Sequence, residues 1–159
     1  MKLAARIAVP LVVVAALTGC AHSPSTAAIV GDRVISDAEL TEIVDSCKAA
    51  GLKPNRSKVV SLMVLGEIFE GAAQRLGKSF DDAALQAMKD DPQLAPLVGT
   101  PCEQAFKNSF RVELGQETLD LDSVKAALPS VELNPRYGSW DPEHGINFRG
   151  GSISVEAKS

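Results

Sequence analysis

Few residues of this sequence have side chains that could do acid–base, metal or nucleophilic chemistry. It has three cysteines and two histidines, and the histidines, His22 and His144, lie near opposite ends of the chain. No close Cys or His pair has the spacing of a zinc finger, and Asp81-Asp82 and Asp90-Asp91 lack the alternating ligands and distal glutamate of a calcium loop. No phosphate-binding loop, dinucleotide fingerprint or nucleophile elbow occurs. We therefore predict that the protein is not an enzyme and uses no metal or cofactor.

The first cysteine, Cys20, lies at the end of a segment ordered like a secretory signal. Lys2 and Arg6 precede an apolar run from Ile7 to Leu17, which matches the charged and apolar regions of such signals. A membrane-spanning helix needs about 20 apolar residues, so this shorter run predicts export rather than spanning. The residues Leu17-Thr18-Gly19-Cys20 resemble the lipobox of bacterial lipoproteins. That resemblance implies cleavage before the cysteine and attachment of a diacylglyceryl group to its sulfur.

The lipobox divides the chain and predicts its location. Residues 1–19 become a lipoprotein signal peptide, and residues 20–26 become a short tether between the acylated, palmitate-type anchor and the folded part. The mature protein is then expected outside the cytoplasm, held by its lipid on a membrane of the cell envelope. The alternative is an ordinary secretory signal cut at a nearby small residue, with Cys20 incidental.

The other two cysteines, Cys47 and Cys102, form an even pair once Cys20 is acylated. Export places them in an oxidising compartment, which favours a disulfide between them. The alternative is two free buried thiols that behave as small hydrophobic residues.

The composition argues against a nucleic-acid partner and favours a helical fold. The whole chain has a net charge of -4, and loss of Lys2 and Arg6 with the signal makes the mature part more acidic. No basic block survives cleavage, so we predict no nucleic-acid partner. Aromatic residues make up only 4% of the chain, which favours a small helical domain over an aromatic-rich β-sandwich.

Local start and stop signals divide residues 27–142 into one domain of four or five helices, closed by a small sheet of strands from its two ends. Two short apolar stretches flank a Gly31-Asp32 turn, and Ser36-Asp37-Ala38-Glu39 has the pattern of a capping box. The expected helices cover residues 37–50, 58–76, 81–89, about 100–114 and 122–128. Asn55 or Ser57 is expected to cap the second of them, Asp81 the third and Thr100 the fourth. Val131 and Leu133 predict a strand, with Pro135 at an edge or bulge. Residues 143–159 are expected to form a polar tail, either disordered or weakly paired between 146–148 and 153–155.

Both ends of this domain resemble one family. The stretch from Ala28 to Leu40 resembles the opening of SurA- and PrsA-type extracytoplasmic chaperones and foldases, and Asn134-Pro135-Arg136-Tyr137-Gly138-Ser139-Trp140 resembles a strand near their carboxyl end. The resemblance implies a SurA N-terminal-domain-like helical fold that binds polypeptide clients. Many members also insert a parvulin isomerase module of roughly 90 residues, for which this chain has no room. Isomerase activity is therefore not expected.

Three functions remain open at this point. The leading hypothesis is a membrane-anchored, chaperone-like module for unfolded or newly exported chains; the others are an interaction lipoprotein for one envelope partner and a carrier of a small apolar ligand. The helix of residues 58–76 is apolar nearly all round in its first half, so it is either enclosed by its neighbours or lines a groove or cavity. The candidate client-binding residues are Val59, Leu62, Met63, Leu65, Phe69, Tyr137 and Trp140.

Overall fold

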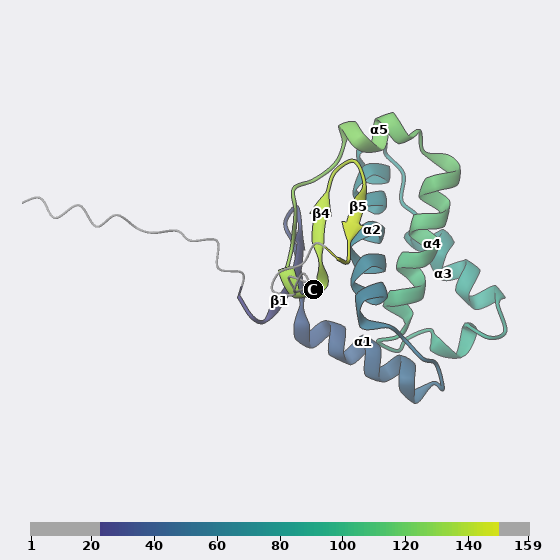
Figure 1. Ribbon diagram of the computed structural model, residues 1–159. Coiled ribbons are helices and arrows are strands. Elements are labelled where there is room, and N and C mark those ends of the chain that lie inside the picture. Colours follow the sequence, from purple (N-terminus) through teal and green to yellow (C-terminus); the bar gives the residue numbers. More distant parts are fainter. Residues whose placement is uncertain (1–22, 150–159) are drawn as a thin grey trace, which may run out of the picture.

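A computed structural model describes residues 23–149 of the protein and shows a mainly helical fold with two small antiparallel sheets (Figure 1). This confirms the expected class. The α-helices of the described residues are α1 Asp37–Ala49, α2 Arg56–Arg75, α3 Asp81–Asp90, α4 Glu103–Thr118 and α5 Leu121–Ala126. Two short 3₁₀ turns cover Ala95–Leu97 and Pro135–Tyr137.

The first helix begins at its predicted cap, and the second begins at Asn55, one of its two candidate caps. The Ser36 hydroxyl accepts a hydrogen bond from the Glu39 N–H at 3.0 Å, and the Asn55 side chain accepts one from the Lys58 N–H at 3.1 Å. Such side-chain acceptors satisfy N–H groups that have no partner inside the helix. The reciprocal half of the capping box is absent, because the Glu39 carboxylate pairs with Arg33 instead.

The starts of α3 and α4 differ from expectation. We expected Asp81 to cap α3, but the Phe80 N–H at that end donates to the carboxylate of Glu70 at 2.9 Å. We expected Thr100 to cap α4, yet its hydroxyl donates to the Leu97 carbonyl at 2.7 Å. The Glu103 N–H donates to the Thr100 carbonyl at 3.0 Å, so α4 begins with a backbone acceptor and without a side-chain cap.

The larger sheet joins the two ends of the domain, as predicted. It contains β1 Thr26–Val30, β2 Arg33–Ser36 and β3 Val131–Leu133 in the order β2-β1-β3. Ile29 of the central strand lies opposite Val34 on one side and Glu132 on the other. The turn between β1 and β2 uses Gly31 with φ of 57°, a conformation that glycine adopts at little cost.

The carboxyl-terminal segment differs from the extended strand that we expected. Pro135 begins a 3₁₀ turn, because the Tyr137 N–H bonds back to the Asn134 carbonyl at 2.8 Å. A hairpin of β4 Ser139–Asp141 and β5 Gly145–Asn147 follows. β5 therefore pairs with β4, whereas the alternative partner at residues 153–155 lies outside the described residues.

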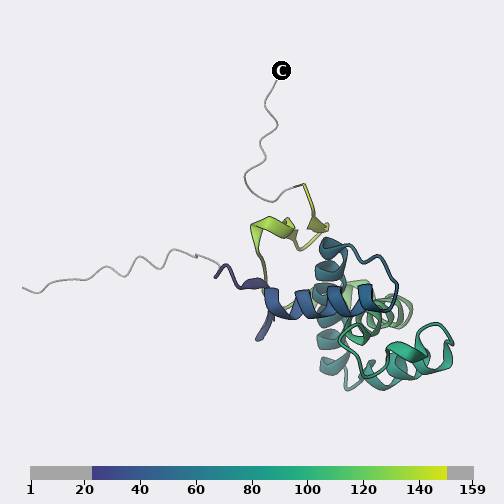
Figure 2. The same cartoon turned by 90° about the horizontal axis from the view of Figure 1, so that it is seen from below.

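Helix α2 is the centre of the molecule and contacts α4, α1, α5 and β1. Figure 2 shows α1 crossing the end of this helical layer. Two glycines allow α2 and α4 to approach closely: Gly66 lies against Asn108, and Gly115 lies against Phe69. A Cβ at Gly66 would be 2.1 Å from the Asn108 Oδ1, so a larger residue there would force the helices apart.

Candidate functional site

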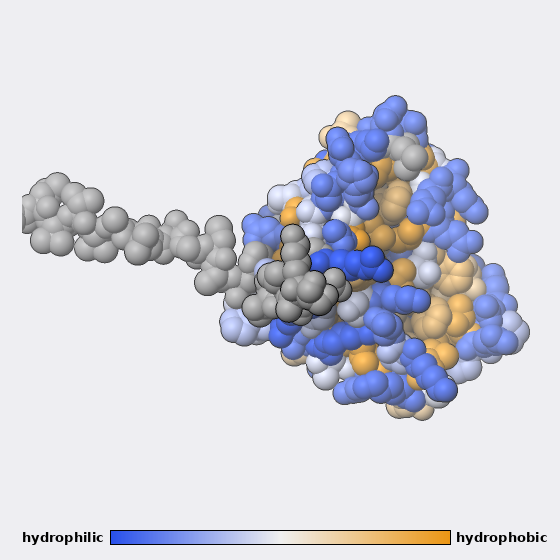
Figure 3. Space-filling view, viewed as in Figure 1, coloured by the Kyte–Doolittle hydropathy of each residue, from blue (hydrophilic) through white to orange (hydrophobic). Residues whose placement is uncertain are grey.

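An open apolar cavity of about 320 Å³ lies where the α1–α2 connection meets the beginnings of α2 and α4. We call it the α2–α4 groove. In the space-filling view, apolar surface interrupts the hydrophilic exterior on the side formed by these helices (Figure 3). The groove is lined by Cys47 of α1, by Leu52, Lys53, Pro54 and Asn55 of the connection, by Lys58, Val59 and Leu62 of α2, and by Ala105, Phe106 and Ser109 of α4.

Helical spacing explains the groove's apolar walls. Val59 and Leu62 lie three residues apart on α2, so they share one face. On α4, the half-buried ring of Phe106 lines the groove together with the small side chains of Ala105 and Ser109. Small residues leave the space that a larger pair would fill. The groove can thus receive an apolar side chain, and no histidine or carboxylate lines it.

A disulfide between Cys47 and Cys102 lies beside this groove. Their Cα atoms are 4.9 Å apart although 55 positions separate them in sequence, and both residues are buried. The Cys102 N–H also donates to the Ser46 hydroxyl at 3.2 Å. The end of α1 is therefore fixed to the start of α4, and since Cys47 lines the groove, the crosslink fixes one wall of it.

The predicted client-binding residues of α2 differ in their position: some line the groove and others are buried in the core. Val59 and Leu62 line the groove, although Val59 is only 4% exposed; Met63, 1% exposed, and Phe69, 7% exposed, do not line it. The Met63 sulfur accepts a hydrogen bond from Asn108 at 3.1 Å, and Leu65 is half-buried against the core. In this conformation Val59, Met63 and Phe69 all have little exposed surface for a client, so Leu62 is the groove-lining candidate of α2 that is not buried.

The two aromatic candidates of the carboxyl end also pack on the domain. Tyr137 is buried and its hydroxyl lies between Asp37 and Arg56, accepting a hydrogen bond from the Arg56 Nε at 2.9 Å. The Arg136 guanidinium lies over the Tyr137 ring, 5.1 Å from its centroid. Trp140 is half-buried and lies opposite Ile146 across the hairpin. These contacts give Tyr137 a structural role, and we name the cluster of Asp37, Arg56, Arg136 and Tyr137 the terminal clasp.

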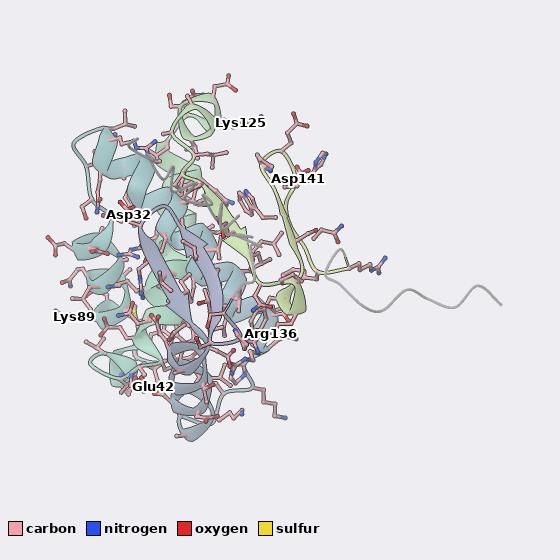
Figure 4. All side chains as sticks on the ribbon, turned by 90° about the vertical axis from the view of Figure 1, so that its left-hand side faces the viewer. Asp32, Glu42, Lys89, Lys125, Arg136 and Asp141 are labelled. Carbon is pink, nitrogen blue, oxygen red and sulfur yellow. A yellow bond between two sulfur atoms is a disulfide. The ribbon has the colours of Figure 1, made fainter. Side chains whose placement is uncertain are left out.

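The other residues of the same motif extend the clasp to the first strand. The Asn134 side chain donates to the Thr26 carbonyl at 2.8 Å, and Arg136 donates to the Pro24 carbonyl. Gly138 has φ of 123°, and a Cβ there would be 2.5 Å from the Asn147 carbonyl oxygen. Figure 4 shows Arg136 beside this turn and Asp141 at the hairpin beyond it. The motif therefore closes the domain by joining its two ends.

The clasp changes the titration of Asp37. The hydrogen bond from Tyr137 is the largest cause that lowers the pKa of this carboxyl below its ordinary value, followed by the hydrogen bond from Arg56. Both bonds favour the ionised form. The carboxylate of Asp37 is thus held in the charged state on which the clasp depends.

A buried polar network that was not predicted from the sequence connects α2, α3 and α4. Arg111 is 6% exposed; its guanidinium bonds to Asp81, to Glu67 at 3.1 Å and to Asn108 at 2.9 Å. The Glu70 carboxylate, 3% exposed, accepts hydrogen bonds from Ser79 and the Phe80 N–H. A buried charge is tolerable only when it is paired in this way. One feature of the sequence could have indicated this network: Asn108 and Arg111 follow Ala105 at intervals of three residues, which places all three on one face of α4.

The remaining chemical candidates do not form a site within residues 23–149. No group of three or more His, Cys, Asp or Glu residues in this range could hold a metal ion. His144 is exposed and contacts Asp141 at 2.9 Å, while Cys20 and His22 lie outside the described residues. No helix of the described part is long and apolar enough to cross a membrane.

Comparisons with known proteins return no relative from which a function could be carried over: no protein-family model, curated protein or solved structure matches this chain.

Proposed function

We propose that the protein is a lipid-anchored, extracytoplasmic lipoprotein that binds unfolded or newly exported polypeptides without isomerase activity. The observation that carries this proposal is the α2–α4 groove, an apolar recess without an acid–base or nucleophilic constellation in its lining. Its small-residue wall of Ala105 and Ser109 leaves room for a guest side chain. A SurA N-terminal-domain-like fold is part of the proposal, supported by the sequence likeness at both ends of the domain.

The size of the groove fits weak and tolerant binding. A cavity of about 320 Å³ is at the lower end of the range for small-molecule pockets. It holds one or two side chains, and burial of one Leu or Phe contributes about 1.5–3 kcal/mol. Much of this is offset by the loss of motional freedom on association. Weak binding suits a chaperone that must release clients without ATP.

The disulfide supports a preformed site. Because the crosslink fixes the end of α1 to α4, the groove wall does not have to order when a client arrives. Preorganisation lowers the cost of binding. It also suits an oxidising compartment, where the crosslink persists.

An aggregation assay with the exported mature protein tests this function. Several unrelated proteins are unfolded by heat or by dilution from denaturant, without reductant, and their light scattering is followed with and without near-stoichiometric amounts of the protein. We expect slower aggregation of most clients and no acceleration of a proline-limited refolding step. Protection of none of them would reject chaperone-like binding in favour of a dedicated envelope partner, and accelerated isomerisation would contradict the proposal that isomerase activity is absent.

A further inference from the structure

The charge around the α2–α4 groove is opposite to the charge of the protein as a whole. The chain has a net charge of -4, yet the charged residues that line the groove are Lys53 and Lys58, and no acidic residue lines it. Both lysines are exposed. No ion pair joins either of them to another residue within positions 23–149.

The basic residues nearest to Lys53 and Lys58 in the sequence do have acidic partners. Lys48 pairs with Asp45 at 3.1 Å, and Arg56 pairs with Asp37 at 2.8 Å. Within the described part of the chain, Lys53 and Lys58 share the lack of an acidic partner with other exposed lysines such as Lys89 and Lys125, but they differ from these in lining an apolar recess.

The first turn of α2 strengthens the positive field at the same place. Acidic residues occupy the first turns of α1, α3, α4 and α5, but none occupies the first turn of α2. The amino end of a helix carries partial positive charge, which acidic residues ordinarily complement. At α2 the first turn instead carries Lys58.

We propose that the α2–α4 groove selects polypeptide segments in which a bulky apolar side chain is flanked by carboxylates. This proposal rests on the proposed polypeptide binding and names its substrate class. The apolar side chain enters between Leu62 and Phe106, and the carboxylates lie at the rim, within reach of Lys53 and Lys58. Apolar contact supplies affinity, and the two lysines discriminate among clients, since surface charges contribute more to specificity and association rate than to affinity.

A peptide is a better fit than an acyl chain for two reasons. The cavity is open and small, so it would enclose only part of a long hydrocarbon tail. Polar side chains of Asn55 and Ser109 lie in its wall, and a polypeptide backbone can hydrogen-bond with such groups whereas a hydrocarbon cannot.

Binding of matched peptides to the exported mature protein tests the inference. Three fluorescent, unstructured peptides carry the same central Phe-Leu pair, flanked by aspartates, by serines or by lysines. We expect the aspartate peptide to bind roughly fivefold more tightly than the serine peptide and the lysine peptide to bind least, because exposed ion pairs are individually weak. The preference should decrease at high salt, where surface charges are screened.

Charge reversal assigns the preference to the groove. The double variant Lys53→Glu/Lys58→Glu should prefer the lysine peptide, and both positions are exposed, so the fold should persist; circular dichroism checks this. The matched control is Lys89→Glu/Lys125→Glu, on the exposed faces of α3 and α5 (Figure 4), which should keep the preference of the parent protein. Lys53→Gln/Lys58→Gln, which removes the charges without adding new ones, should bind all three peptides alike.

The outcomes separate this inference from the proposed function. Equal binding of the three peptides by the parent protein would overturn the inference and leave chaperone-like binding intact. Binding of none of them, with a fatty acid such as laurate bound instead, would overturn both. An unchanged preference in the Lys53→Glu/Lys58→Glu variant would also overturn the inference, because the selectivity would then arise elsewhere on the protein.

Discussion

The Tyr137 hydroxyl donates a hydrogen bond to the Asp37 carboxylate, across 100 positions of sequence. The same hydroxyl accepts from Arg56 at 2.9 Å, so one atom links the first turn of α1, the first turn of α2 and the turn after β3. The strand pair β1–β3 already brings the two ends together. The terminal clasp fixes the positions of α1 and α2 relative to these paired strands.

Replacement of Tyr137 by Phe should destabilise the protein while keeping the ring in place. It removes both hydrogen bonds of the hydroxyl and leaves the carboxylate of Asp37 with one donor fewer. Because the bonds involve charged partners, we expect a loss of about 1.5–3 kcal/mol in the free energy of unfolding, measured by urea denaturation. A double-mutant cycle with Asp37→Asn isolates the pair. Strict additivity of the two substitutions would show that the hydroxyl and the carboxylate are not coupled.

The stability contributed by Asp37 should depend on pH. Its pKa is lower in the folded protein than its ordinary value, chiefly through the Tyr137 hydrogen bond. A carboxyl with a lowered folded pKa contributes stability above its unfolded pKa of about 3.9, and this contribution is lost as pH falls through the folded value. Asp37→Asn should therefore cost more at neutral pH than in acid.

Urea denaturation of parent and variant at neutral pH and below the ordinary carboxyl range measures this difference. Asp32→Asn is a suitable control, because Asp32 lies exposed in the β1–β2 turn, where either residue is favourable. A cost for Asp37→Asn that stays constant with pH would contradict the assignment of the shift to the folded clasp.

Helix caps within one segment, the pairing of the two terminal strands and the cysteine pair were predictable, whereas side-chain partners contributed by other helices were not. The side chains of Ser36 and Asn55 cap helices by accepting hydrogen bonds from N–H groups three residues later, and such spacings can be read in the sequence. Asp81 also resembles a cap in the sequence. In the structure, however, the Glu70 carboxylate of α2 accepts the hydrogen bond from the Phe80 N–H at the start of α3, and the Asp81 carboxylate accepts one from Arg111. A residue type indicates what a side chain can bond to; which partner it finds depends on tertiary packing.

The candidate site shows the same division. The excess of apolar residues on α2 predicted that this helix is either enclosed by neighbouring helices or lines a groove. The structure shows both outcomes on one helix. Met63 packs against Asn108, whereas Leu62, one position earlier, lines the groove. Adjacent helical positions differ by about 100° in direction, so which of them is covered depends on where α4 lies.

The crosslink between Cys47 and Cys102 should form in the exported protein. Intact mass before and after alkylation, with and without reductant, detects it; two freely alkylating thiols in the native protein would contradict the pairing. For a closed loop of this size chain entropy predicts about 4 kcal/mol of stabilisation. The variant Cys47→Ala/Cys102→Ala should lose most of that free energy of unfolding in urea.

The lipid anchor should depend on Cys20 alone. Replacement of Cys20 by Ser removes the acyl acceptor, so the variant should lose incorporation of a labelled fatty acid and accumulate with its signal uncleaved. The matched control is Cys47→Ser, which should be acylated and cleaved like the parent. Normal processing and localisation of Cys20→Ser would show that the signal is an ordinary secretory one.

Client binding should depend on Leu62 and not on apolar surface in general. Leu62 lines the groove, whereas Leu76 lies at the far end of the same helix and is 53% exposed. Leu→Gln keeps helix propensity nearly unchanged, so both Leu62→Gln and Leu76→Gln should fold. We expect Leu62→Gln to lose about 1–2 kcal/mol of apolar contact with a bound side chain, which corresponds to roughly a five- to thirtyfold weaker Kd for the aspartate-flanked peptide. Leu76→Gln should bind like the parent. If the two variants weakened binding equally, the binding surface would have to be sought outside the α2–α4 groove.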